Sequence, residues 1–140
     1  MNKEKERKKL LKLARGNIGK PYKYGAKLEK APNFFDCSSF IQYLYKEINV
    51  SLPRTALDQA SRGFEIKKND QLEIGDLIFI KGAWGHYNPE FPDGIGHVAI
   101  YIGDGKTVSA RWLKRDRKVI EESANDYLNR HDFRIIKRIL

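Results

Sequence analysis

The stretch NFFDCSSFI, residues 33–41, contains the only cysteine of the 140-residue chain. A lone cysteine is most often a small buried hydrophobic residue, and less often a thiolate nucleophile that pairs with a histidine from elsewhere in the chain. After Asp36, apolar residues recur at helical spacing as far as Ile48. Asp is also a favourable N-cap residue. The stretch therefore predicts a buried central helix that begins at Cys37.

Length and composition indicate one domain with a single hydrophobic core. Hydrophobic residues make up 41% of the 140 positions, which suits one domain of ordinary size. The formal net charge of +9 attracts polyanions such as nucleic acid, anionic lipid or acidic wall polymers, and charge alone does not choose among them. A single cysteine excludes an internal disulfide, so the core has to hold the fold without a cross-link.

The basic N-terminal segment places its leucines on one helical face and predicts an amphipathic helix from Lys3 to Arg15. We expect this helix to dock on the core, with binding to a membrane or wall surface as the alternative. We divide the chain into this helical region, 1–18, and a domain of residues 19–140. Neither a secretory signal nor a membrane-spanning apolar run is recognised. The sequence as written predicts a cytoplasmic product, and an extracellular or periplasmic one requires a longer protein or another export route.

The second half of the chain predicts strands, because short runs rich in β-branched and aromatic residues alternate with Gly and Asp turn signals. These runs are GDLIFI (75–80), HVAIYIG (97–103), KTVSA (106–110), RKVIEE (117–122) and FRIIKRIL (133–140). Short helices are expected within residues 54–61, with Thr55 as the cap, and within residues 123–131. Helices first and antiparallel strands after them predict an α+β domain.

Cys37 and His97 form a candidate nucleophile and base. The start of a helix is a place where the pKa of a thiol can fall, and Cys37 is predicted to lie there. An imidazole is then needed to pair with the thiolate and to protonate the leaving amine. His97 opens the strand at 97–103, whose partner is expected to be the strand at 75–80. A nucleophile at a helix start and a base on a sheet are a papain-like arrangement.

Five motifs occur in order: GKPYKYGA (19–26), FDCSSF (35–40), LPRTALDQ (52–59), GDLIFI (75–80) and GHVAIYIGDGK (96–106). Together they resemble the NlpC-type cell-wall peptidases, a family of papain-like cysteine hydrolases. The resemblance implies helices packed on a central antiparallel sheet, with Cys37 as nucleophile and His97 as base. It also implies hydrolysis of peptide bonds in peptidoglycan stems, commonly between D-glutamate and a diamino acid, without a metal or cofactor. We expect a monomer that acts on peptidoglycan or muropeptides and binds no nucleic acid.

The same resemblance assigns further site residues. Tyr24 takes the position of an aromatic residue near the cysteine, where it helps to bind the substrate or the oxyanion. Asp36 and Ser38 match neighbours of the nucleophile that receive the amino end of the substrate. Arg54 is interpreted either as a ligand of a substrate carboxylate or as one side of a structural salt bridge. His86 is interpreted as a solvent-exposed loop histidine, with a place in a lid or one side of the cleft as the alternative.

The third catalytic position falls on Ser109, where the family usually has a histidine or another polar residue. A serine hydroxyl can accept a hydrogen bond from the imidazole, but it stabilises an imidazolium less than a carboxylate does. His86, Asp104 and a backbone carbonyl are alternative partners for His97. Two other functions therefore stand beside a cysteine peptidase: a non-catalytic wall or nucleic-acid binder with a degenerate site, and an amidase or acyltransferase that uses the same cysteine and histidine.

Overall fold

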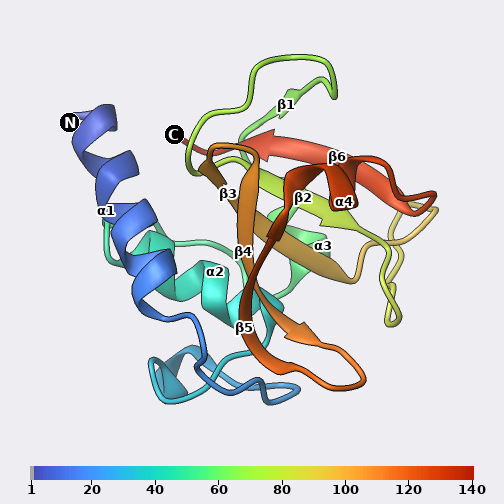
Figure 1. Cartoon of the computed structure of the whole chain (residues 1–140). Coiled ribbons are helices and arrows are strands. Elements are labelled where there is room, and N and C mark those ends of the chain that lie inside the picture. Colours follow the sequence, from blue (N-terminus) through green and yellow to red (C-terminus); the bar gives the residue numbers. More distant parts are fainter. Residues whose placement is uncertain (1) are drawn as a thin grey trace.

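An antiparallel sheet of six strands forms the centre of the computed structural model, which describes residues 2–140 (Figure 1). Its strands are β1 (Phe64–Ile66), β2 (Leu77–Ile80), β3 (His97–Gly103), β4 (Lys106–Trp112), β5 (Arg117–Ser123) and β6 (Phe133–Arg138), in the spatial order β1-β6-β2-β3-β4-β5. The helices are α1 (Lys3–Gly16), α2 (Cys37–Lys46), α3 (Ala56–Gln59) and α4 (Ala124–Leu128), with a 3-10 turn, η1, at Leu28–Lys30. The predicted α+β class is confirmed.

The start of α2 is fixed by a capping box. The Asp36 carboxylate accepts the backbone N–H of Ser39 at 2.8 Å, and the Ser39 hydroxyl accepts the backbone N–H of Asp36 at 3.0 Å. The apolar face of the helix packs against β3 and β4. This face consists of Phe40, Ile41, Leu44 and Tyr45, all fully buried. Cap and periodicity together place Cys37 in the first turn, as the sequence predicted.

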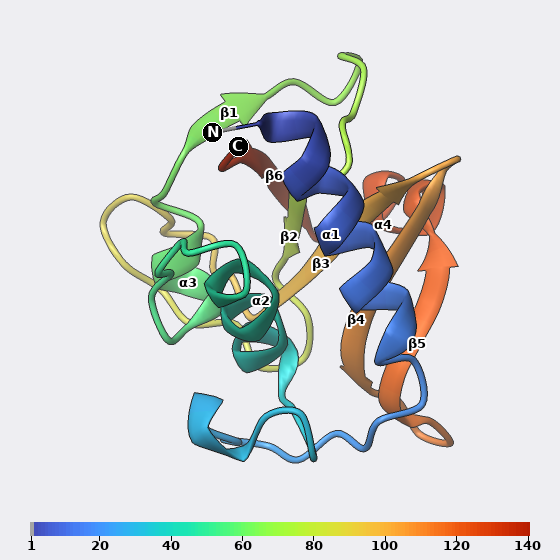
Figure 2. The same cartoon turned by 90° about the vertical axis from the view of Figure 1, so that its left-hand side faces the viewer.

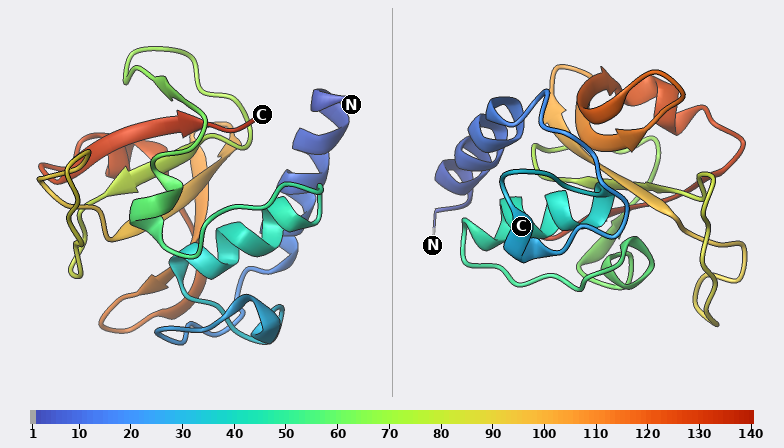
Figure 3. Two further views of the ribbon diagram at one scale, coloured as in Figure 1. Left: turned by 180° about the vertical axis from the view of Figure 1, so that it is seen from behind. Right: turned by 90° about the horizontal axis from the view of Figure 1, so that it is seen from below.

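β3 separates two layers of side chains. Val98 and Ile100 pack in the larger core with α1 and α2, whereas Ala99 packs on the other face, in a cluster with Tyr127 of α4. This alternation is the period of two of a β-strand. Figures 2 and 3 show α1 and α2 on one side of the sheet and α4 on the other. The sheet therefore brings residues of α2 and α4 close to the same end of β3 from opposite faces.

Apart from the 3-10 turn η1, the remaining elements also follow the prediction, with one addition. β2 pairs with β3, and Ile80 lies opposite His97. Thr55 caps α3 by accepting the backbone N–H of Asp58 at 3.2 Å. The addition is β1, three residues long, which pairs with β6 and is too short to show a strand pattern in the sequence. None of the helices within residues 2–140 is long and apolar enough to cross a membrane.

α1 is docked on the core, as expected. Leu10 and Ala14 on its inner face are fully buried, and they belong to the same core as the apolar face of α2. Asn2 caps the helix by accepting the backbone N–H of Lys5 at 3.1 Å. The division of the chain after residue 18 stays a prediction.

Replacing Leu10 with alanine is expected to lower the free energy of unfolding by about 2–5 kcal/mol, because a fully buried leucine leaves a cavity. Denaturant unfolding measures this change. Lys12→Ala, on the exposed face of the same helix, is the matched control and should change the free energy by less than about 0.5 kcal/mol. A loss for Leu10→Ala no larger than that of the control would show that α1 contributes nothing to the core.

Candidate active site

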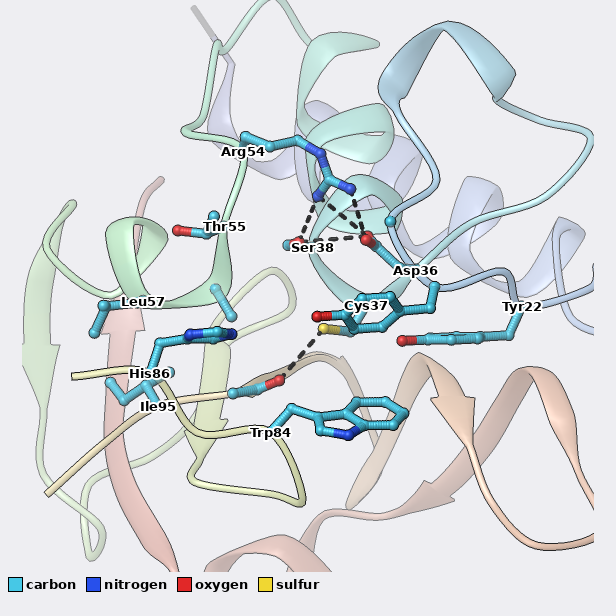
Figure 4. Close-up of a pocket in the computed structure, with 14 residues that line it drawn as sticks. Tyr22, Asp36, Cys37, Ser38, Arg54, Thr55, Leu57, Trp84, His86 and Ile95 are labelled. Carbon is cyan, nitrogen blue, oxygen red and sulfur yellow. Dashed lines mark hydrogen bonds and ion pairs between the residues drawn. The ribbon is translucent and has the colours of Figure 1, made fainter.

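Cys37 lies against the backbone of β3. Its Sγ is 3.8 Å from the carbonyl oxygen of Gly96, to which the thiol donates, and the backbone of Val98 forms a hydrogen bond with the same sulfur (Figure 4). The thiol therefore contacts the residues on both sides of His97. With only 9% of Cys37 exposed, the sulfur is reached from the cleft alone.

The thiol of Cys37 is protonated at rest. Burial raises its pKa from 9.0 to about 12, and the negative charge of Asp36 acts in the same direction. Hydrogen bonds from the backbone of Val98 and Ser38 and the charge of Arg54 oppose this rise without cancelling it. The pKa of this thiol is therefore raised and not lowered as expected, because burial and the charge of Asp36 outweigh the hydrogen bonds and the charge that act against them.

His97 lines one cavity of about 220 Å³ together with Cys37. Within residues 2–140 no hydrogen bond joins the thiol to the ring directly. Burial holds the pKa of His97 well below its usual range. The charges of Arg111 and Arg130 lower it further, against an opposing effect of Asp132. The resting pair is thus a neutral thiol beside a neutral imidazole.

A second cavity, of about 280 Å³, opens on the other side of Cys37 and contains an ion pair. Arg54 binds the Asp36 carboxylate through Nη2 at 2.6 Å and Nη1 at 3.3 Å. Nη1 also donates to the Ser38 hydroxyl, and Nη2 to the carbonyl of Ala26, each at 2.8 Å. Of the two interpretations of Arg54, the structure shows the salt bridge. A role toward a substrate carboxylate stays a prediction.

Tyr22 is an aromatic residue that lines both cavities together with Cys37. Burial, followed by the charge of Cys37, raises the pKa of its phenol, so the hydroxyl stays a hydrogen-bond donor. Tyr24, for which this place was expected, is 61% exposed at the rim of one cavity, where its ring meets the edge of Trp84. Both tyrosines belong to GKPYKYGA, and only the folded chain distinguishes them.

The loop of residues 81–96 forms one side of the cleft. Trp84 and His86 line the cavity opposite Arg54 (Figure 4). Gly96 allows the loop to close, since a Cβ there would lie 2.5 Å from the backbone oxygens of Lys81 and Trp84. The Trp84 ring also meets the edge of the Trp112 ring, with 5.8 Å between their centres. The site is thus a covered cleft with the thiol at its base.

Comparison with known proteins assigns the family. A family model described as the NlpC/P60 family matches residues 19–137. The chain belongs to this family. It is 34% identical over 122 residues to a probable endopeptidase of Corynebacterium glutamicum, which covers 87% of this chain and 50% of that protein. It is 31% identical over 97 residues to a γ-D-glutamyl-L-lysine dipeptidyl-peptidase of Bacillus cereus, which covers 69% of this chain and 27% of that protein.

The fold agrees with this assignment. The solved NlpC/p60 domain of the peptidoglycan hydrolase SagA matches with a TM-score of 0.71 at 28% identity, and the match covers 94% of this chain and 97% of that one. The predicted papain-like fold is thereby confirmed. The chain spans half or less of the length of the two curated relatives named above.

In this NlpC/P60 domain, Ser109 reaches His97 only through a tyrosine. His97 Nε2 lies 3.0 Å from the hydroxyl of Tyr127, and Ser109 Oγ lies 3.0 Å from that same hydroxyl. Asp104 lies in the β3–β4 turn, at the opposite end of β3. The ring partner of His97 is therefore neither His86 nor Asp104. The sequence placed Tyr127 in a short helix, but no motif connects it with a histidine 30 residues away.

Asp36→Ala removes both the cap of α2 and the partner of Arg54, and it is expected to lower the free energy of unfolding by about 1–3 kcal/mol. Asp36→Asn keeps an oxygen that accepts the N–H of Ser39 and loses only the charge, so its loss should be about 1 kcal/mol or less. Denaturant unfolding of the two variants checks this order. Equal losses would contradict the role of Asp36 as a cap.

Proposed function

We propose that this NlpC/P60 domain is a cysteine peptidase that hydrolyses stem peptides of peptidoglycan, at the bond between D-glutamate and the diamino acid. The observation that carries the proposal is the position of Cys37 at a helix start, in one cavity with His97. The bond follows the name of the Bacillus cereus relative, which acts between γ-D-glutamate and L-lysine. The net charge of +9 is compatible with an anionic wall polymer as partner.

The first step is attack by sulfur on the scissile carbonyl. Because thiol and imidazole are both neutral at rest, His97 takes the thiol proton as the Sγ–carbon bond forms, rather than before it. The carbonyl oxygen becomes an oxyanion. The backbone N–H of Cys37, which has no hydrogen-bond partner within residues 2–140, is available to it at the start of α2. The Tyr22 hydroxyl supplies a second donor.

The tetrahedral intermediate then collapses. The C–N bond breaks, the imidazolium of His97 gives its proton to the leaving amine, and Cys37 holds the acyl part as a thioester. A water molecule takes the place of the amine, and His97 removes its proton as it attacks the thioester. Release of the carboxylic acid returns the proton to sulfur and restores the neutral pair.

The cavity with the ion pair receives the acyl side of the substrate. The Asp36 carboxylate and the Ser38 hydroxyl supply acceptors for the amino end of the stem, and Arg54 holds both in place. Trp84 and Tyr24 cover the opposite side with exposed aromatic surface. The cleft therefore presents polar groups on one side of the nucleophile and an apolar cover on the other.

Mass spectrometry of purified muropeptides tests this function. The wild-type domain should cleave them, with product masses that identify the D-glutamyl bond, while Cys37→Ala should lower the rate by at least about a thousandfold. His97→Ala should lose activity to a similar degree, because the two residues act as a unit. Cleavage that survives in Cys37→Ala would contradict the mechanism. Binding without cleavage by the wild type would favour the non-catalytic binder, and transfer to an added amine would favour an acyltransferase.

A further inference from the structure

Four polar groups surround the hydroxyl of Tyr127, on the face of the sheet opposite α2. His97 Nε2 and Ser109 Oγ each lie 3.0 Å from it. Arg111 Nη1 donates to it at 2.8 Å, and the hydroxyl donates to Glu122 Oε1 at 2.8 Å. The hydroxyl is shielded from water, since only 1% of Tyr127 is exposed. Its hydrogen bonds are therefore made within the protein. The number of donor and acceptor sites on the phenol decides which partner donates in each bond.

A phenol has one O–H and two lone pairs. Arg111 only donates, so it occupies one lone pair, and the Glu122 carboxylate only accepts, so it takes the hydroxyl proton. One lone pair remains, and both His97 Nε2 and the Ser109 hydroxyl lie 3.0 Å from the oxygen that carries it. His97 Nε2 has to carry a proton to use it, since an unprotonated nitrogen would face an oxygen with no proton left to donate. The two charged residues thus set the tautomer of the histidine through the tyrosine between them.

We infer that Tyr127 is the positioning residue of His97: its hydroxyl oxygen accepts the Nε2–H and leaves Nδ1 unprotonated. Cys37 and His97 line the same cavity, so Nδ1 is then the ring nitrogen free to take the proton of the thiol during attack. The effect of Tyr127 on the reaction rate rests on the proposed function, whereas the tautomer of His97 does not.

Tyr127 occupies the position next to the ring where Ser109 was expected. Ser109 and His97 project to the same face of the sheet as Tyr127, and the serine hydroxyl bonds to the phenol instead of the ring. The two rings lie nearly parallel, with 12° between their planes, which aligns the hydroxyl with the edge of the imidazole. Arg111 and Glu122 are paired at 3.5 Å, and both form hydrogen bonds with the Tyr127 hydroxyl. The orienting group thus comes from α4 rather than from β4.

NMR of ¹⁵N-histidine-labelled wild-type protein tests the tautomer directly and needs no activity. Long-range proton–nitrogen spectra distinguish a protonated nitrogen from an unprotonated one, and His97 is assigned by the loss of its signals in His97→Ala. We expect a protonated Nε2 and an unprotonated Nδ1 at neutral pH, and a mixture of tautomers in Tyr127→Phe. A protonated Nδ1 in the wild type, or an unchanged tautomer in Tyr127→Phe, would overturn the inference.

Kinetics on muropeptides then separate positioning from folding. Tyr127→Phe should lower kcat roughly ten- to a hundredfold with KM within about twofold, because it leaves the Nε2–H without a partner. Ser109→Ala should change kcat less than about threefold. Tyr45→Phe is the matched control, since it removes another buried hydroxyl bond, to Gly75, outside the cleft, and should leave kcat unchanged.

Full kcat in Tyr127→Phe would overturn the positioning role, as would a loss in Ser109→Ala equal to that in Tyr127→Phe. If the wild type itself cleaves no muropeptide, the proposed function fails, and the NMR result still decides the inference about Tyr127.

Discussion

The contact between the first turn of α2 and the start of β3 is the interaction on which the site depends. It brings the thiol of Cys37 to 3.8 Å from the carbonyl of Gly96, one residue before His97. The capping box at Asp36 fixes the residue at which the helix begins, and the apolar face of α2 fixes its position on the sheet. A shift of one residue in either element would separate Cys37 from His97, so local capping and core packing both determine the geometry of the candidate site.

This contact also sets the charge state of the pair. Burial raises the pKa of Cys37 and lowers the pKa of His97, so both groups favour their neutral forms. In the proposed mechanism the proton therefore moves from sulfur to the ring during attack, and no thiolate is stored.

The sequence predicts those features that depend on local patterns. The boundaries of α2 follow from Asp36 and a helical apolar stripe, and the place of His97 follows from the strand that it opens. Two site residues depend on tertiary packing and were missed. Tyr22 is distinguished from Tyr24 only by its contacts in the folded chain. Tyr127 reaches His97 from α4, 30 residues further along the chain. Ser109 was expected to orient the ring because it takes the third catalytic position of the family. The order of residues along the chain does not show that Tyr127 lies between Ser109 and His97.

Ultraviolet absorbance of the thiolate tests the central claim most directly. The chain has one cysteine, so the difference between wild type and Cys37→Ala during a pH titration reports Cys37 alone. A raised pKa keeps the thiol protonated to higher pH, and no thiolate should be detected at pH 7, with the signal rising only above about pH 9. A thiolate already present at pH 7 would contradict the account, because it would mean that the resting site holds an ion pair.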